Sequence, residues 1–396
     1  MDYNKYFMDL LSRLVSIPSQ SQNEEDCAAF LAGLLRDDLG MEARLERVEG
    51  KSCSVTAALS GSGPKACGSP AEKKQRRLLL GGHIDTVSAA EGWDTDPLRL
   101  TVKGDRGYGL GAADMKGGLA AQVTVLKKLI DEGACFAGEI EFTALCDEER
   151  HSIGANDYVQ RKRSDERQEI PDFAVFAEPH YDNIVTGATG KVLLSLEIRG
   201  TAGHAANPET GVNAIDCTAA FLDEINRVYT PQYLAGRRAS HCILRIGSKY
   251  GGYSLNIPEV CTALLNKQLY VGEEAEAFIG ELRELYTRRV GKGDLSISRE
   301  VPYYPSYELD RSHPDLRMLL KLLEDGYESR PELRLNQSVS DGNILYTQLG
   351  IPTLLFGPEG HDYHKANEYI VLSTAYRYMD MLYDFIQLYF KRPFPG

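Results

Sequence analysis

The sequence predicts an α/β protein of two domains, and three observations support this prediction. The chain has 396 residues, which is more than one compact core usually contains. Helical and strand-like segments alternate in its first half and again near its end, as in a layered α/β sheet. Residues 188–302 interrupt this alternation with a small α+β unit. We therefore expect one domain made of residues 1–187 and 303–396, with residues 188–302 inserted into it as a second domain.

Apolar spacing and turn residues predict the elements of the larger domain in order along the chain. They are helices over 3–16 and 23–38, a strand from 78, a helix over 119–133, strands over 139–146 and 172–179, a helix over 312–327, a strand over 351–358 and a helix over 374–390. Residues 61–76 are rich in glycine, proline and lysine, which predicts a surface loop before the strand at 78.

The inserted unit is expected to contain both strands and helices. Its predicted strands are 191–200, 240–251 and 261–272, and its predicted helices lie near 211–228 and 274–289. Open α/β sheets bind ligands at the carboxyl ends of their strands, so the strand ends of the larger domain are the places to search for a functional site.

Composition excludes some classes of partner. The formal net charge of -13 argues against nucleic acid or an anionic membrane as the main partner. The short basic runs at 73–77 and 161–163 are interpreted as solvated loops. The first twenty residues lack the basic start and apolar run of a signal peptide, and no segment has the roughly 18 apolar residues of a membrane span. Eight scattered cysteines without a C-x-x-C pair predict reduced thiols in a cytoplasm.

The segment "LLLGGHIDTV" (78–87) ends in an unusual way for a buried strand. His83 and Asp85 are two residues apart, so alternation along a strand puts both side chains on one face. Alone, a histidine at a strand end is more often a hydrogen-bonded structural residue. Asp114 in "GAADMKGG" could likewise cap a helix, and "DEER" (147–150) could be a solvated charge run.

Taken together, these segments favour a metal site. Five strand or loop ends supply His, Asp, Glu, Glu and His, which suit Zn²⁺ or a similar divalent ion. Two ions about 3.5–4 Å apart need a carboxylate between them. The absence of cysteine from the set is typical of a catalytic rather than a structural zinc site. In this interpretation His83 binds a metal and Asp85 accepts the other ring N–H, which fixes the tautomer.

At these residues the sequence resembles the M20 metallopeptidase family, the group that includes acetylornithine deacetylase, succinyl-diaminopimelate desuccinylase, aminoacylase-1 and glutamate carboxypeptidase. "GGHIDTV", "GAADMKGG", "DEE", "AEP", "GTAGHAANPETGVNAI", "NIPE" and "GPEGHDYHKANEY" occur in the order of that family, over nearly the whole chain. The resemblance implies a di-zinc, aminopeptidase-like catalytic domain with an inserted lid domain, through which the chain forms a homodimer. It also implies two divalent ions, Zn²⁺ above all, with Co²⁺ or Mn²⁺ as alternatives.

The resemblance further implies a role for individual residues. His83 and Glu178 would hold the first metal, Glu149 and His364 the second, and Asp114 would bridge both. Glu148 would be the general base. His204 in the inserted domain would stabilise the oxyanion in the active site of a neighbouring subunit, and Asn256 would contact substrate. The peptide bond after Asp114 is often cis in this family.

Several positions depart from the family pattern. Ser88 replaces a usual proline, Leu110 a common arginine, and "SDG" (340–342) stands near the usual "GTD". In "LLNKQLYVGE" (264–273), Asn266 and Gln268 occupy the positions of an Asp-x-Arg pair whose arginine binds a substrate carboxylate in many relatives. Lys267 or Arg245 could replace that arginine, although Arg245 is better interpreted as a surface strand residue.

The expected function is hydrolysis of an amide bond in an N-acyl amino acid or a small peptide, with Glu148 taking a proton from a metal-activated water. Dipeptides are an alternative substrate class. A non-catalytic or single-metal protein that binds a ligand or dimerises is the competing function. A phosphate-binding loop at "GAADMKGG" is disfavoured because the segment lacks the G-x-x-x-x-G-K-[ST] pattern.

Overall fold

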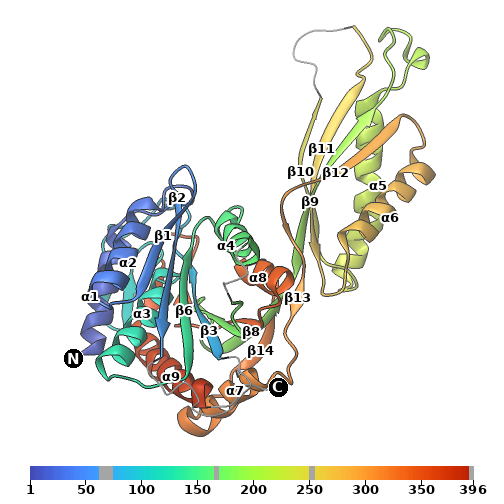
Figure 1. Cartoon of the computed structure of the whole chain (residues 1–396). Helices are drawn as coiled ribbons and strands as arrows, with labels where there is room; N and C mark the ends of the chain where they lie inside the picture. The colour runs from blue at the N-terminus through green and yellow to red at the C-terminus, as the bar shows by residue number, and fades with distance from the viewer. Residues whose placement is uncertain (62–74, 165–168, 249–254, 392–396) are drawn as a thin grey trace. The chain divides into compact units, whose positions relative to one another are not determined.

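The computed structural model describes residues 1–61, 75–164, 169–248 and 255–391, which fold into two compact units. The larger unit comprises Met1–Gly187, Glu308–Asn336 and Ser340–Gly396, and the smaller unit comprises Ala188–Tyr307 and Gln337–Val339. Both units combine helices with β-sheets (Figure 1), so the predicted α/β class is confirmed. Residues 62–74 of the predicted surface loop lie outside the described residues.

A nine-stranded sheet forms the centre of the larger unit, in the order β1-β2-β6-β3-β7-β15-β8-β13, with β14 paired to β8. Its strands are β1 Glu42–Glu49, β2 Ser52–Ser60, β3 Arg76–His83, β6 Gly138–Leu145, β7 Phe173–Phe176, β8 Asn183–Ala188, β13 Tyr307–Glu308, β14 Glu332–Asn336 and β15 Thr353–Leu355. The four central strands β6, β3, β7 and β15 are parallel to one another. Their carboxyl ends therefore meet at one edge of the sheet.

Helices pack on both sides of this sheet. They are α1 Tyr3–Ser16, α2 Glu25–Asp37, α3 Lys116–Asp131, α4 Ile153–Ser164, α7 Pro314–Tyr327, α8 Asp341–Leu349 and α9 Leu372–Lys391. The helices α1 and α3 lie on one side, and α4 and α8 on the other (Figure 1). In α1, Phe7, Leu10, Leu11, Leu14 and Val15 recur at helical spacing and are all buried, as the sequence predicts. This layer continues from α1 through α3 and α9 to α7.

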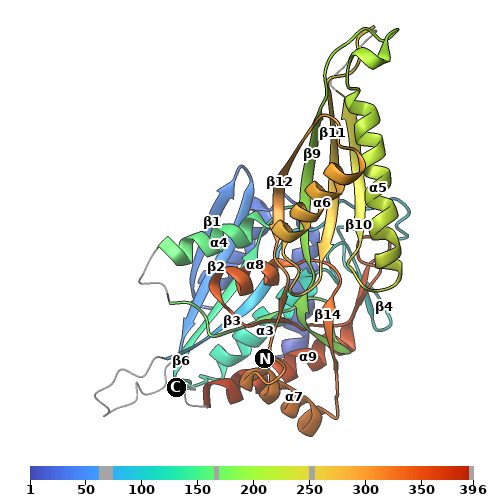
Figure 2. The ribbon, with the colours of Figure 1, turned by 90° about the vertical axis from the view of Figure 1, so that its right-hand side faces the viewer.

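The smaller unit is a four-stranded antiparallel sheet in the order β10-β11-β9-β12, with two helices packed against it (Figure 2). Its elements are β9 Gly190–Arg199, the short 3-10 helix Pro208–Thr210, α5 Ala214–Leu234, β10 His241–Ser248, β11 Val260–Leu269, α6 Ala275–Arg289 and β12 Asp294–Tyr304. The strand β12 has no counterpart among the predicted strands. It is an edge strand, and most of its residues are exposed. Leu295 and Ile297 alternate with polar residues and pack on the core, but the charged residues Arg299 and Glu300 end this short pattern in the sequence.

A third, small sheet in the larger unit carries the segment around residue 364. It has the order β16-β17-β5-β4, with β16 Gly360–His361, β17 Tyr369–Val371, β5 Arg106–Tyr108 and β4 Thr101–Lys103. Residues 362–368 connect β16 to β17, so their ends are fixed by antiparallel pairing. In the described part of the chain, no helix has both the length and the apolarity needed to cross a membrane.

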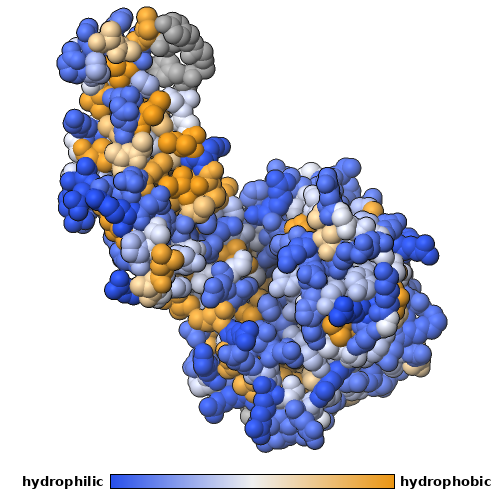
Figure 3. Space-filling view, turned by 180° about the vertical axis from the view of Figure 1, so that it is seen from behind, coloured by the Kyte–Doolittle hydropathy of each residue, from blue (hydrophilic) through white to orange (hydrophobic). Residues whose placement is uncertain are grey.

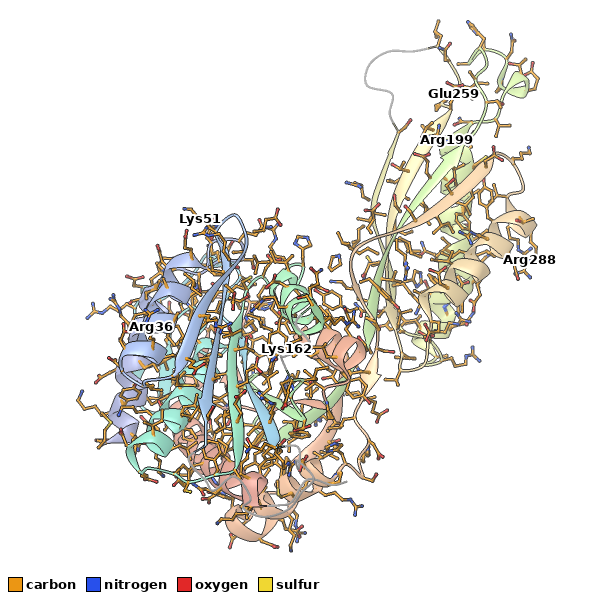
Figure 4. The ribbon with its side chains drawn as sticks, in the orientation of Figure 1. Arg36, Lys51, Lys162, Arg199, Glu259 and Arg288 are labelled. Carbon is orange, nitrogen blue, oxygen red and sulfur yellow. The ribbon has the colours of Figure 1, made fainter. Side chains whose placement is uncertain are left out.

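The prediction that the two basic runs are solvated loops is wrong for the described arginines and lysine, because Arg76 and Arg77 lie in β3 and residues 161–163 lie in α4. Residues 73 and 74 lie outside the described residues. Lys162 lies in α4 (Figure 4), and its Nζ is 2.6 Å from Oε2 of Glu141 in the central sheet. Arg161 is in the same helix. Arg76 starts β3, is 4% exposed and pairs with Asp315 of α7 at 2.6 Å. A run of basic residues is solvated only where no buried carboxylate lies opposite it. The sequence does not show that Glu141 and Asp315 lie opposite these two runs.

The Arg76–Asp315 pair gives a stability prediction. Asp315→Asn should lower the free energy of unfolding by about 3–5 kcal/mol, because it leaves the buried guanidinium without a counter-ion. The control is Asp9→Asn, which breaks the exposed Lys5–Asp9 pair and should cost less than about 1 kcal/mol. Urea unfolding followed by fluorescence and circular dichroism measures both changes. Equal midpoints for Asp315→Asn and the unmodified protein would contradict the assigned role of this pair.

Candidate metal centre

Strand register brings the predicted site residues to one edge of the central sheet. In the parallel pairs, His83 at the end of β3 lies opposite Leu145 at the end of β6, and Gly81 lies opposite Phe176 at the end of β7. The residues that follow β6 and β7 therefore leave the sheet beside His83. These are the segment 147–149 and the residue at 178, which places four of the candidate side chains on neighbouring strand ends.

His83 is held by both of its ring nitrogens and is 2% exposed. Its Nδ1 is 3.0 Å from the backbone oxygen of Asp85. Because a carbonyl oxygen only accepts, Nδ1 carries the proton of this hydrogen bond. Nε2 points the other way, 3.0 Å from Oδ1 of Asp114 and 3.9 Å from Oε1 of Glu178. Burial lowers the pKa of His83, but its contacts with Asp114 and Asp85 outweigh burial and raise this pKa well above its usual value.

Asp85 acts through its backbone and its side chain at once. Its carbonyl orients His83, whereas its carboxylate is 3.6 Å from the ring nitrogen and is mainly occupied elsewhere. Oδ1 accepts from the backbone N–H of Glu148 at 3.0 Å, and Oδ2 accepts from that of Glu149 at 3.2 Å and from Oγ of Ser21 at 2.7 Å. The sequence predicts the contact of Asp85 with His83, but it does not predict the hydrogen bonds of Asp85 to the backbone N–H groups of residues 148 and 149.

Asp114 lies between two histidines. Its Oδ1 faces His83, and its Oδ2 is 3.3 Å from Nε2 of His364. Burial raises the pKa of Asp114, but the hydrogen bonds from His364 and His83 outweigh it and lower this pKa below the usual range. The Asp114–Met115 peptide bond is cis. Asp114 does not cap the following helix, whose N-cap position is Met115.

The loop that carries Asp114 is held by a carboxylate of the "KANE" segment, for which the sequence predicts no role. Glu368 is 2% exposed and accepts the backbone N–H groups of Gly111, Ala113 and Asp114 at 2.9, 2.9 and 3.0 Å. Behind this loop, a Cβ on Gly118 would lie 2.0 Å from the carbonyl oxygen of Ala177, so only glycine lets the first turn of α3 approach the end of β7.

Glu149 and His364 complete the cluster on its more exposed side. Oε1 of Glu149 is 2.9 Å from Nε2 of His364, and half of the His364 side chain is exposed. Hydrogen bonds with Asp114 and Glu149 raise the pKa of His364 to about 10. His364 has a left-handed backbone conformation with φ 63°, which turns the chain between β16 and β17 toward the strand ends.

His361, the other histidine of this segment, is engaged elsewhere. Its Nε2 is 2.6 Å from Oε1 of Glu359, and its ring stacks on Tyr369 with centroids 5.1 Å apart. The structure therefore brings His364 to Asp114 and Glu149, and it directs His361 to a separate pair on the small sheet.

The remaining carboxylates make the centre strongly acidic. Burial raises the pKa of Glu178 to about 8, with His83 opposing and Asp114 and Glu149 adding to the rise. Burial likewise raises the pKa of Glu148 well above its usual value, again against His83. Asp341, at the start of α8, has its pKa raised to about 7, chiefly by burial. Asp341 belongs to the "SDG" segment (340–342), whose sequence alone does not predict a place beside the cluster.

The donor set fits a divalent cation. One atom each of His83, Asp114 and Glu149 lie within 4.8 Å of one another, and Glu178 and His364 extend this group on its two sides. All donors are imidazole nitrogens and carboxylate oxygens, the ligands that catalytic zinc sites use. The cluster also contains more negative than positive groups, so a cation would balance its charge.

Lys116 follows Met115 and is a buried cation close to Asp114 in the sequence. It is 1% exposed, and its Nζ donates to the carbonyl oxygens of Leu14 and Ile17 at 2.9 and 2.8 Å. These oxygens lie at the C-terminal end of α1, where the helix dipole favours a positive charge. Lys116 therefore ties the Asp114 loop to the N-terminal segment and does not point at the candidate ligands.

Two predicted residues lie in the smaller unit and are adjacent there. His204 and Asn256 form an isolated β-bridge, and both are exposed. Nδ1 of His204 accepts from the backbone N–H of Ala206 at 3.1 Å. This histidine is therefore oriented by its own loop, with its Nε2 on the side away from that hydrogen bond.

The structure removes Lys267 as a replacement for the missing arginine. It is 1% exposed, its Nζ donates to the carbonyl oxygen of Ala239 at 3.2 Å, and it lies 5.5 Å from the ring of Phe278. Alternation in β11 puts Asn266 and Gln268 on the opposite face. Lys267 therefore belongs to the core of the smaller unit. Its position in the sequence agrees with this, because Leu265 and Leu269, two residues before and after it, point to the same face of β11.

Arg245 has a different position. A register shift between Ile243 and Arg245 pairs Arg245 with Leu264, and Leu264 has the same parity in β11 as Asn266 and Gln268. Without the extra residue, Arg245 would lie on the face of the helices. The bulge thus turns this arginine to the sheet face that Asn266 and Gln268 share.

Comparison with known proteins agrees with this geometry. A family model described as "Peptidase family M20/M25/M40" matches residues 79–388. Among curated relatives, an acetylornithine deacetylase from Aliivibrio salmonicida is 29% identical over 94% of both chains. An N-formyl-4-amino-5-aminomethyl-2-methylpyrimidine deformylase from Halalkalibacterium halodurans is 25% identical over 98% of this chain and 95% of its own.

The fold is also that of solved peptidases. A tripeptidase from Staphylococcus aureus superimposes with a TM-score of 0.78 at 19% identity, covering 98% of this chain and 99% of its own. The family match spans most of the chain and includes every candidate metal ligand. This protein therefore belongs to peptidase family M20/M25/M40, a family of metal-dependent hydrolases that act on C–N bonds.

Proposed function

We propose that this chain hydrolyses an amide bond of an N-acyl amino acid or a small peptide, using two divalent cations, with Zn²⁺ as the first candidate and Co²⁺ or Mn²⁺ as alternatives. One observation carries the proposal: the two carboxylate oxygens of Asp114 face two different histidines, His83 at 3.0 Å and His364 at 3.3 Å. A carboxylate that presents one oxygen to each of two imidazoles has the arrangement that a bridging ligand needs.

The proposed ligands divide into two sets around Asp114. His83 and Glu178 would hold one cation on the buried side, and Glu149 and His364 would hold the other on the more exposed side. When bound, such cations polarise the carbonyl of the substrate and lower the pKa of a water molecule. The hydrogen bond from Nδ1 of His83 to the Asp85 carbonyl leaves Nε2 directed at the centre, which is the orientation a ligand requires.

Glu148 is the proposed general base. Its backbone N–H is fixed by Asp85, so its carboxylate starts from a defined position beside Glu149 and Glu178. Burial raises its pKa toward the range in which a carboxylate transfers protons efficiently. In the proposed reaction Glu148 takes a proton from the attacking water and then delivers it to the leaving nitrogen of the amide.

The relatives support an N-acyl substrate. Their names describe the removal of an acetyl or a formyl group from an amine, which is the same hydrolysis on two different leaving groups. On the smaller unit, the sheet face that Asn266, Gln268 and Arg245 share carries neutral amides and a guanidinium, which are groups that can bind a polar substrate. Dipeptides remain the alternative class, and the tripeptidase fold is compatible with them.

Removal of the base tests the proposed function. Glu148→Ala should lower kcat by about 10²–10⁴-fold and leave two cations bound, because it removes a proton carrier and no ligand. The assay uses a panel of N-acyl amino acids and dipeptides, with metal content measured by elemental analysis of protein purified without added zinc. Loss of a cation in this variant would show that Glu148 and Glu149 have exchanged roles. An unmodified protein without metal or amidase activity would favour a ligand-binding function.

The two histidines of the 361–364 segment allow a matched comparison. His364→Ala should lower the metal content, whereas His361→Ala should leave it unchanged, because His361 is paired with Glu359 and stacked on Tyr369. Both variants remove one imidazole from the same segment, so general destabilisation affects them alike. Metal analysis after gel filtration measures the difference. A protein that loses metal with His361→Ala alone would overturn the ligand assignment.

We also propose that the smaller unit forms a homodimer. In the described residues, β10 is an edge strand that pairs only with β11, and its Leu244 and Ile246 are 54% and 51% exposed. Hydrophobic residues also lie on the surface of this unit in Figure 3. An unpaired edge with exposed apolar side chains is suited to pairing with a second chain. A second copy would satisfy both the backbone groups and the apolar side chains.

Mixed dimers test a catalytic role of His204 across the dimer. His204→Ala should be nearly inactive, because a donor to a developing oxyanion contributes about 2.7–4 kcal/mol. Mixing His204→Ala chains with Glu148→Ala chains should restore activity, since each mixed dimer would have one site with an intact Glu148 and a His204 from the other chain. A folded mixture that exchanges subunits, shown by mass-tagged chains, yet stays inactive would exclude the role of His204 in trans.

A further inference from the structure

The segment between α1 and α2 is packed directly against the residues that carry the candidate metal centre. Ser19 Oγ donates to the carbonyl oxygen of Ile84 at 2.8 Å, and the backbone N–H of Thr86 donates to that of Ser19 at 2.9 Å. Ser21 donates to the carboxylate of Asp85. The segment 17–24 therefore forms hydrogen bonds with all three residues that follow His83, which are residues 84–86. It lies outside residues 79–388, to which the family model extends.

Glu24 connects the same segment to the turn at residues 147–149, which carries Glu148 and Glu149. Its side chain is 0% exposed, and its Oε1 accepts the backbone N–H of Gln22 at 2.7 Å and that of Asp147 at 3.2 Å. The second of these bonds joins residues that are 123 positions apart. Asp147 has a left-handed φ of 61°, so the chain bends sharply at the residue that Glu24 contacts.

Three successive backbone N–H groups of this turn are each bound by a buried carboxylate. Glu24 binds that of Asp147, and Asp85 binds those of Glu148 and Glu149. The carbonyl oxygen of Asp147 in turn accepts the N–H of Ser152 at 2.7 Å. These bonds to three N–H groups and one carbonyl hold the backbone of the turn, and the backbone sets the directions in which the Glu148 and Glu149 side chains leave it.

We propose that Glu24 is a positioning residue for the metal centre, because its Oε1 fixes the first residue of the turn that carries Glu148 and Glu149. This inference rests on the proposed function for its consequence, which is that the cation bound by Glu149 and His364 depends on Glu24. The cation bound by His83 and Glu178 should depend on it less, because His83 ends β3 and Glu178 follows β7, so neither residue lies on the turn that Glu24 holds.

Two conservative substitutions distinguish the effect of the length of the Glu24 side chain from the effect of its charge. Glu24→Asp keeps the carboxylate but shortens the side chain by one methylene, so that its oxygens no longer reach the N–H of Asp147. Glu24→Gln keeps an oxygen at the same reach but removes the charge. Glu24→Asp should weaken the cation of Glu149 and His364 by about 10–100-fold, as is usual for residues that orient ligands. Glu24→Gln should keep the affinity of the unmodified protein.

Metal titration of the metal-free protein against a chromophoric chelator measures the two binding steps. His364→Ala identifies which step belongs to the cation of Glu149 and His364. The control is Glu141→Asp, the same shortening at a buried glutamate of the larger unit, whose partner is Lys162. It should leave both steps unchanged. Hydrogen exchange of the 147–149 amides in metal-free protein should accelerate in Glu24→Asp alone.

The outcomes separate this inference from the proposed function. If the unmodified protein binds two cations and Glu24→Asp changes neither step, the role of Glu24 is wrong and the proposed function stands. If Glu24→Gln weakens binding as much as Glu24→Asp, Glu24 acts through its charge, which also overturns the inference. If the unmodified protein binds no cation, the proposed function fails, and the exchange rates of 147–149 alone decide whether Glu24 fixes the turn.

Discussion

The hydrogen bonds of Asp85 are the interaction on which the geometry of the site depends, because this carboxylate is 0% exposed and both of its oxygens accept from N–H or O–H donors. Its oxygens bind Ser21 and the amides of Glu148 and Glu149, while its carbonyl orients His83. One residue therefore couples three segments that are far apart in the sequence. The geometry of every candidate ligand on β3 and β6 depends on this coupling, because a shift of Asp85 would move a histidine and two glutamates together.

The many carboxylates of the centre lower the stability of the folded chain when no metal is bound. Burial raises the pKa values of Glu178, Glu148 and Asp341, neighbouring carboxylates add to the rise, and His83 opposes it. Such a cluster destabilises the fold in the way that functional sites commonly do. A cation that binds the folded chain would remove this repulsion and add its binding free energy to stability. Stability and metal content should therefore rise together.

Much of the fold and of the centre could be predicted because strand ends and motif order are local properties of the sequence. The α/β class, the family and the convergence of His83, Asp114, Glu149, Glu178 and His364 follow from these signals. Glu24 and Glu368 could not be assigned, since their roles consist of hydrogen bonds to backbone N–H groups up to 257 positions away. No side-chain pattern marks an amide that will need a carboxylate. The burial of Lys162 could not be predicted for a related reason, because its partner Glu141 lies in a different element.

The bonds of Glu368 also bear on the order in which the chain can fold during synthesis. The loop at 111–114 leaves the ribosome early, but the carboxylate that holds it comes more than 250 residues later, in the same segment as His364. The smaller unit is nearly continuous in sequence, so it can complete its sheet while the C-terminal part is still being made. The larger unit cannot be completed before its C-terminal part is made, so the apolar faces of its parallel strands stay incompletely covered until then. Chaperones that shield nascent chains would accordingly engage the larger unit rather than the smaller one.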